Sequence, residues 1–284
     1  MLTVLLDGVA YGMLLFVLAC GLSVTLGLMN FVNLAHGAIA MIGGYVTVVA
    51  MNRFGVPFLA CLPLAFAASA LVGLVLERTL YRRLYDRPHL EQVLFSIGLV
   101  FMAMSAVDFF FGASPQLITL PEWMRGRVEI LGAGIGGYRL FVILVCAVIA
   151  LGLQLVLART RFGSQLRASV DDARVARGLG IRVGLVFAVT FAAGSGLAGL
   201  GAAIGADILG MEPFFPIKYM IYFLIVVTVG GTKDLAGPFF ASLLIGIGDV
   251  AGKYYVPEFG AFAIYTIMVA ILIVRPQGLF GRAA

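Results

Sequence analysis

Polar side chains interrupt an apolar part of the chain near its N-terminus, in the segment MNFVNLAHG at residues 29–37. Asn30, Asn33 and His36 follow one long uncharged run and precede another. Amide and imidazole groups can hydrogen-bond backbone groups that a helix break leaves unpaired, and they can also contact a solute directly. We therefore predict a helix start after a short break. Backbone support is the first interpretation, and solute contact or proton-linked switching are the alternatives.

A second polar interruption occurs late in the chain, in VGGTKDLAGP at residues 229–238. Lys233 and Asp234 separate two short apolar runs, and the turn is rich in Gly and Pro. NLAHGAIA from Asn33 and DLAGPFFA from Asp234 also form a weak internal echo, for which chance similarity is an equal alternative. Breaks at related positions of two repeats are where transporters place their solute sites. The candidate pathway residues are Asn30, Asn33, His36, Gly37, Thr228, Lys233 and Asp234.

Residue patterns for enzymatic chemistry are missing from the sequence. The GK of GDVAGKY lacks the spacing of a phosphate-binding loop, and Ser195 lacks the turn pattern of a hydrolase nucleophile. The His, Cys and carboxylate residues show no metal-ligand spacing. We therefore expect no catalytic residue, no cofactor-binding residue and no metal site, so the chain is predicted not to be an enzyme.

The composition indicates the elements that must hold these polar groups. The 284 residues are 62% hydrophobic and only 12% charged, whereas soluble domains are nearer one quarter charged. Uncharged runs at 9–28, 56–76, 140–158 and 183–206 each approach the roughly 20 residues of a membrane-spanning helix. Further apolar runs occupy residues 31–52, 92–107, 219–232, 235–248 and 259–274. We predict an all-α polytopic membrane protein in contact with lipid, with interrupted helices and no nucleic-acid partner.

Positive charge predicts the orientation in the membrane. Twelve of the 19 Lys and Arg residues fall in residues 77–92, 159–182 and the tail from Arg275. The positive-inside rule places these segments, including the C-terminus, in the cytoplasm. Nine crossings satisfy this placement with an external N-terminus. Eight crossings also satisfy it if residues 31–52 are re-entrant and the N-terminus is internal. We prefer nine.

The basic segment at residues 159–182 shows a regular residue pattern that solubility alone does not require. Leu166, Val170 and Ala173 recur at helical spacing, and acidic residues precede basic ones in the order that suits a helix dipole. Gly178 and Gly180 would end such a helix. The pattern fits a short amphipathic helix that offers an apolar face to another protein, and equally fits an ordinary solvated loop.

Four stretches resemble the permease subunits of branched-chain amino-acid ABC transporters. They are TLGLMNFVNLAHGAIAMIGGYV, RFGSQLRASVDDARVARGLGI, VVTVGGTKDLAGPFFASLLIG and RPQGLFGR, in family order along the whole chain. Thr232, Lys233 and Asp234 depart from the family pattern, which leaves the substrate open. The resemblance implies a single permease domain at residues 1–284 and a coupling helix that docks on an ATPase. The coupling candidates are Arg161, Phe162, Arg167, Asp171, Asp172, Arg174 and Gly180.

The resemblance also implies partners and a function. The chain would form half of an importer pathway for branched-chain or other hydrophobic amino acids in a bacterial cytoplasmic (inner) membrane. It would pair with a second related permease, two cytoplasmic ATP-binding subunits and an external or periplasmic substrate-binding protein. Urea or a small aromatic acid is the alternative cargo. A stand-alone channel or secondary carrier is the alternative class, and it predicts no ATPase-docking helix.

Overall fold

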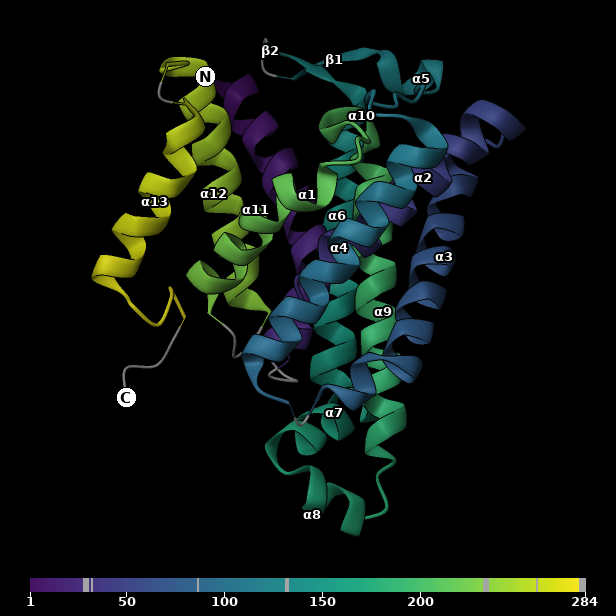
Figure 1. Ribbon diagram of the computed structural model, residues 1–284. Helices are drawn as coiled ribbons and strands as arrows, with labels where there is room; N and C mark the ends of the chain where they lie inside the picture. Colours follow the sequence, from purple (N-terminus) through teal and green to yellow (C-terminus); the bar gives the residue numbers. More distant parts are fainter. Residues whose placement is uncertain are drawn as a thin grey trace.

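The chain folds into a bundle of long helices in the computed structural model, which describes residues 1–27, 31, 33–85, 87–130, 133–231, 235–258 and 260–280 (Figure 1). Six of the described helices are long and apolar enough to cross a membrane. They are α1 (Leu2–Gly27), α2 (His36–Phe54), α3 (Phe58–Thr79), α4 (His89–Phe111), α6 (Gly137–Arg159) and α9 (Val183–Ile204). The later helices are α11 (Phe215–Gly230), α12 (Ala236–Tyr255) and α13 (Gly260–Val274).

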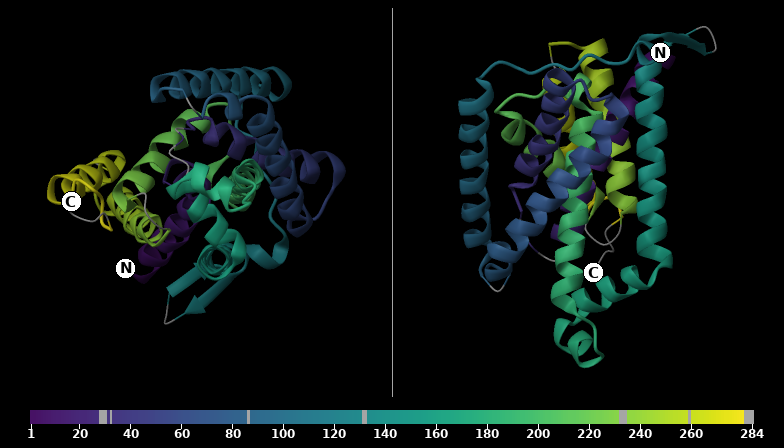
Figure 2. Two further views of the ribbon diagram at one scale, coloured as in Figure 1. Left: turned by 90° about the horizontal axis from the view of Figure 1, so that it is seen from below. Right: turned by 90° about the vertical axis from the view of Figure 1, so that its right-hand side faces the viewer.

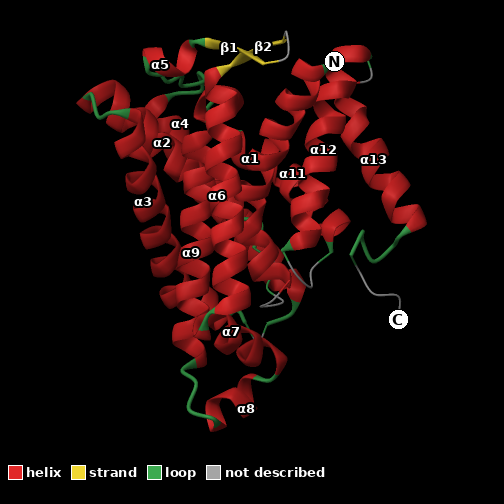
Figure 3. Ribbon diagram, turned by 180° about the vertical axis from the view of Figure 1, so that it is seen from behind, coloured by secondary structure: helices red, strands yellow, loops and turns green. Residues whose placement is uncertain are grey.

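The short elements lie at the two ends of the bundle. α5 (Glu122–Arg125), the antiparallel hairpin of β1 (Arg127–Ile130) and β2 (Ala133–Gly136), and α10 (Ala206–Leu209) share one end with the N-terminus (Figure 3). The opposite end carries α7 (Arg161–Asp171), α8 (Ala173–Gly178) and η1 (Tyr81–Arg83), and the tail after α13 turns toward it. We call these the hairpin end and the α7–α8 end.

All nine apolar runs expected from the sequence form helices. Several boundaries move. The run predicted from Val9 is helical from Leu2, the run predicted from Phe31 becomes helical only at His36, and the run predicted to end at Gly248 extends to Tyr255. The N-terminus and the α7–α8 end lie on opposite sides of the bundle (Figure 1). Opposite sides are what the nine-crossing alternative predicts, and the number of crossings stays a prediction, because six of the described helices are long and apolar enough to cross a membrane.

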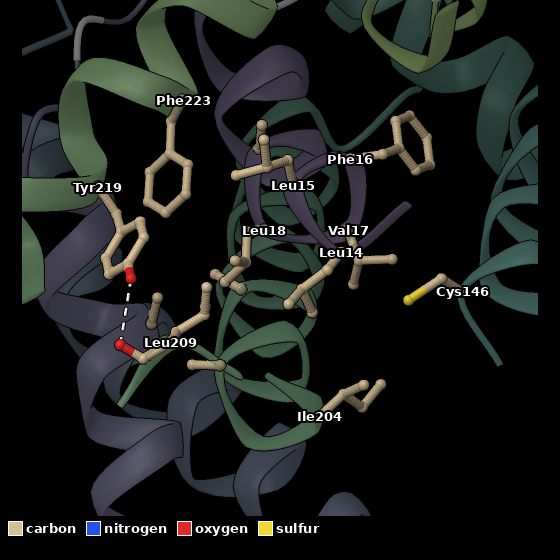
Figure 4. Close-up of a cluster of buried hydrophobic side chains, with 14 of the residues drawn as sticks. Leu14, Leu15, Phe16, Val17, Leu18, Cys146, Ile204, Leu209, Tyr219 and Phe223 are labelled. Carbon is tan, nitrogen blue, oxygen red and sulfur yellow. Dashed lines mark hydrogen bonds between the residues drawn. The ribbon is translucent and has the colours of Figure 1, made fainter. Parts of the chain in front are cut away.

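α1 lies at the centre of the main hydrophobic core. Figure 4 shows its residues Leu14, Leu15 and Leu18 among side chains from α6, α9 and α11, all of them buried. The Tyr219 hydroxyl donates a hydrogen bond of 3.1 Å to the Leu209 carbonyl oxygen in the same region. A helix that is apolar all round and surrounded by other helices is expected to be such a core element.

Small residues allow close packing between helices. A Cβ atom on Gly43 of α2 would overlap the backbone of Gly199 of α9, and a Cβ on Gly246 of α12 would overlap Gly12 of α1. Backbones approach this closely where no hydrophobic force drives helices together in lipid. The glycine-rich helix α9 and the GVAYG segment of α1 therefore pack closely against neighbouring helices.

Peripheral helices carry the exposed apolar surface. α4 stands at the edge of the bundle in both views of Figure 2, and α13 stands at the edge in its left view and in Figure 1. Their exposed side chains include Phe101, Phe109 and Ile273. Apolar side chains on the outside and a packed core inside are what lipid as a solvent permits.

Candidate translocation pathway and partner-docking surface

His36 and Gly37 start α2 in the middle of the bundle. The His36 side chain is buried, its Nε2 donates a 2.8 Å hydrogen bond to the Leu18 carbonyl oxygen, and its ring lies edge-on to Phe223 with centroids 6.1 Å apart. Gly21 makes room for the imidazole, since a Cβ there would lie 2.7 Å from His36 Cε1. Gly37 meets the backbone of α11. These two candidates thus join α1, α2 and α11.

The expected capping roles are wrong for the residues that the structure describes. Leu18 lies inside the continuous α1, so His36 does not bond to a carbonyl at the break. The N-cap of α2 is Ala35, without a side-chain cap hydrogen bond. Asn33 instead accepts a 3.0 Å hydrogen bond on Oδ1 from the Tyr81 hydroxyl. Both polar groups connect separate elements, which sequence spacing does not reveal.

Aromatic rings hold the break between α1 and α2 against the α7–α8 end of the bundle. Phe31 packs on Tyr81 and Tyr85 with ring centroids 5.1 and 5.4 Å apart, and these tyrosines in turn contact Phe191 and Phe187 of α9. Burial raises the pKa of the Tyr85 hydroxyl, and the nearby Glu77 carboxylate raises it further. The break is therefore anchored on the chain between α3 and α4.

The C-terminal tail contacts the end of α11, which precedes the second break. Gly278 has φ +83° and approaches the Thr228 carbonyl oxygen, and the Leu279 amide donates a 2.7 Å hydrogen bond to the Val229 carbonyl oxygen. The sequence analysis missed this role of the tail. The Thr228 residue is exposed. Asn30, Lys233 and Asp234 lie outside the described residues.

The predicted coupling helix is two helices that meet at Asp172. The Asp172 carboxylate caps α8 by accepting hydrogen bonds from the Arg174 and Val175 amides at 2.8 and 2.9 Å. α8 ends as expected from the glycines: Gly180 has φ +83°, and the Ile181 amide bonds back to the Ala176 carbonyl oxygen at 3.0 Å. These bonds satisfy the last carbonyls in a Schellman motif.

The apolar face of α7 is not available to a partner, contrary to the prediction. Leu166 is fully buried with Val24 of α1, Val186 of α9 and Leu235, and Phe162 and Val170 pack against this cluster. α7 also folds tightly onto α6, because Gly163 contacts the Leu157 backbone. α7 therefore uses its apolar face to attach to the bundle.

The exposed apolar residues of this end belong to α8 and its C-cap. Val175 and Leu179 are 57% and 75% exposed and stand four residues apart. Arg161, Asp171 and Arg174 are exposed on the same pair of helices, while the Arg167 side chain bonds to the Leu157 carbonyl oxygen. α8 protrudes farthest from the bundle (Figure 3). It presents an apolar, basic tip.

Charged residues also meet at the hairpin end. Lys253 Nζ contacts Asp249 Oδ2 at 2.6 Å, and Arg139 pairs with Asp7, which is far from it in sequence. Both pairs line one cavity. Asp207 belongs to α10 at the same end, where burial raises the pKa of its carboxyl and Arg125 opposes that shift. Within the described residues, no group of three His, Cys, Asp or Glu side chains could hold a metal.

The fold and its polar breaks define a polytopic α-helical membrane protein with a protruding tip at one end. Residues 4–273 match the protein family described as the branched-chain amino acid transport system, permease component, and the chain belongs to this family. The resemblance read from the sequence is thus confirmed.

Individual relatives are similar over nearly the full length of this chain. The high-affinity branched-chain amino acid transport system permease protein BraD of Pseudomonas aeruginosa is 27% identical, over 98% of this chain and 95% of the relative. LivH of Escherichia coli strain K12 is 25% identical over 97% and 94%. LivM of the same strain is 26% identical over 94% of this chain and 68% of LivM. No solved structure matches the chain.

Proposed function

We propose that the chain forms half of the transmembrane pathway of an ATP-driven importer for branched-chain or other hydrophobic amino acids. Its family is a permease component, and its relatives are named for branched-chain amino acid transport. A second related permease would complete the pathway. The similarity of this chain to both LivH and LivM supports pairing between related permeases.

The α7–α8 end faces the cytoplasm in this proposal, and the hairpin end faces outward in a bacterial inner membrane. Support comes from the position of the basic segments: the α3–α4 connection and the α7–α8 pair lie at one end, and the tail turns toward it. Arg and Lys accumulate in cytoplasmic loops. The hairpin end would receive the external substrate-binding protein.

The tip of α8 is the main structural support for this proposal, because its surface is suited to bind a cytoplasmic ATP-binding subunit. An exposed apolar pair at the farthest point of the bundle has no lipid to cover it, and Arg174 and Arg177 flank it. Apolar anchors with Arg beside them are typical of interface hot spots. α7 would transmit force, because it is fixed to α1 and α9 through Leu166.

His36 and Gly37 are the proposed pathway residues with the best structural support. They start a helix in the bundle interior beside α1 and α11, where a helix break in a transporter commonly lies next to the solute. Uptake by His36→Ala and Asn33→Ala, corrected for the amount of protein in the membrane, compares the two roles. Greater loss in His36→Ala would support pathway contact, and equal loss would support a structural role for both.

Co-purification and transport test the proposal. The tagged permease, expressed with its transport partners and extracted in mild detergent, should retain an ATP-binding subunit and support ATP-dependent uptake of labelled L-leucine in proteoliposomes. Excess L-isoleucine or L-valine should compete, and urea or benzoate should not. Uptake that continues without ATP or the ATP-binding subunit would overturn the importer class. Competition by urea or benzoate alone would overturn the substrate.

Gly180→Asp gives a sharper test of docking. Its φ of +83° is strained for other residues, yet a Cβ there meets no atom within 4 Å. We expect the variant to insert normally but to lose substrate-stimulated ATP hydrolysis. Gly178→Asp, in equally open space but with ordinary backbone, is the matched control. Normal stimulation in Gly180→Asp would contradict the assignment.

A further inference from the structure

A cavity of about 280 Å³ lies near the hairpin end, between helices that are far apart in sequence. Its polar wall comes from α1, α6, α11 and α12 through Asp7, Tyr11, Arg139, Tyr219, Asp249 and Lys253. Ala10, Ile208, Leu209 and Val250 supply apolar wall. Ligand pockets typically begin near roughly 300 Å³, so this space suits a small solute.

The charges in the cavity are ordered by depth. The acidic side chains are the more buried, at 21% exposure for Asp7 and 2% for Asp249. Their basic partners Arg139 and Lys253 are 42% and 52% exposed and form the rim. A solute that enters this cavity therefore meets positive charge first and negative charge behind it.

Asp249 has an unused acceptor. Its Oδ2 contacts Lys253, but its buried Oδ1 has no hydrogen-bond partner among the described residues. The neighbouring Tyr219 hydroxyl does not fill this role, because it donates to the Leu209 carbonyl oxygen. Buried carboxylate oxygens are normally satisfied, and leaving one unsatisfied is costly. Asp249 Oδ1 can therefore accept a hydrogen bond from a donor that enters the cavity.

We propose that this cavity is an outer binding site for a zwitterionic α-amino acid. The solute's ammonium group donates to Asp249, sharing or taking the position of the half-exposed Lys253 Nζ. Its carboxylate binds the guanidinium of Arg139 and the released lysine at the rim. A zwitterion has no net charge, so the exchange leaves the charge of the site balanced. The assignment rests on the proposed import function and gives its amino-acid solute a binding site on this chain.

A neighbouring cavity supports a route from the outside. It measures about 690 Å³, shares Arg139 and Ile208 with the first cavity, and is lined by Leu120, Arg125 and Asp207. Leu120 belongs to the connection between α4 and α5 at the hairpin end, the end proposed to receive the binding protein. A released amino acid would therefore pass along Arg139 into the site.

Direct binding tests the assignment. The purified permease with its partner subunits, in nanodiscs without external binding protein, is titrated with tritiated L-leucine. Asp249→Asn should raise the Kd about tenfold or more, the scale of a lost charged hydrogen bond. Glu212→Gln is the matched control, because Glu212 pairs with the 52% exposed Lys218 at the same end of the bundle but does not line the cavity.

A double variant separates binding from structural pairing. Asp249→Asn with Lys253→Met removes both charges, so neither is left buried and unpaired. The proposal predicts weak leucine binding in the double variant, whereas a purely structural pair predicts wild-type Kd. Competition adds a second readout: 4-methylpentanoate, which lacks the ammonium, should compete at least about tenfold less than leucine in wild type. That gap should narrow in the double variant.

The outcomes distinguish this assignment from the proposed function. Wild-type assemblies that take up leucine with ATP, while both Asp249 variants bind leucine as wild type does, would overturn the outer site alone. Wild-type assemblies that bind no leucine at millimolar concentration would also overturn it. Absence of ATP-dependent uptake in wild type would overturn the importer function itself.

Discussion

Replacing Leu166 by alanine tests how the docking element is joined to the membrane bundle. The Leu166 side chain is fully buried between α7 and residues of α1 and α9, with Val24 and Val186 as neighbours. Removal of its outer carbons leaves a cavity at this junction, and buried Leu→Ala changes cost about 2–5 kcal/mol. Since the cluster joins α7 to the bundle, we expect the loss to appear as local detachment of α7.

Hydrogen exchange measures this detachment. At the lower figure of about 2 kcal/mol, the detached population rises roughly 30-fold, because each 1.4 kcal/mol is a factor of ten. Amides of α7 in Leu166→Ala should therefore exchange faster by that factor in detergent-solubilised protein, with α3 unchanged. Leu179→Ala is the matched control: the same substitution at a 75% exposed position should change stability by less than about 0.5 kcal/mol.

Binding of the ATP-binding subunit should instead be sensitive to the Leu179 substitution, which leaves α7 exchange unchanged. Leu179→Ala should weaken retention of the ATP-binding subunit about tenfold or more, as a truncated hot-spot residue does, while its α7 exchange remains as in wild type. Leu117→Ala, at an exposed position in the connection between α4 and α5, should change neither readout. Equal exchange of α7 in the Leu166 and Leu179 variants would refute the attachment of α7. Full retention by Leu179→Ala would refute docking through α8.

Two further substitutions test the packing and the break. Gly246→Ala should prevent stable assembly of the bundle, because its Cβ would overlap the backbone of Gly12. The control is Gly152→Ala, where a Cβ meets no atom within 4 Å, and this variant should keep or slightly raise the midpoint of thermal unfolding. An unchanged midpoint in Gly246→Ala would contradict the contact between α12 and α1. Tyr81→Phe removes the 3.0 Å hydrogen bond to Asn33 and should lower the free energy of unfolding by about 1–3 kcal/mol, which a lower thermal midpoint would show. Tyr254→Phe, at an exposed ring, is the control. Equal midpoints in the two variants would argue against the pairing of Tyr81 with Asn33.

Local sequence determined which segments form helices and which of them lie in lipid. Apolar runs fix which segments enter lipid, since every backbone group there must bond within a helix. Glycines determine helix ends and close helix contacts directly, because a residue without a Cβ atom permits both. Gly180 ends α8, and Gly199 of α9 contacts α2. The family stretches determined the class of protein, because they extend along the chain in order.

Tertiary structure decided which polar and apolar groups meet. An amphipathic pattern such as that of Leu166 states that one face is buried, but does not state by what; here the bundle covers it, and only α8 remains for a partner. Likewise, Asn33 meets Tyr81, and Asp7 meets Arg139, across long separations in sequence. Periodicity reports only neighbours along one helix, whereas these pairings depend on how helices pack against one another. The candidate outer site exists for that reason alone.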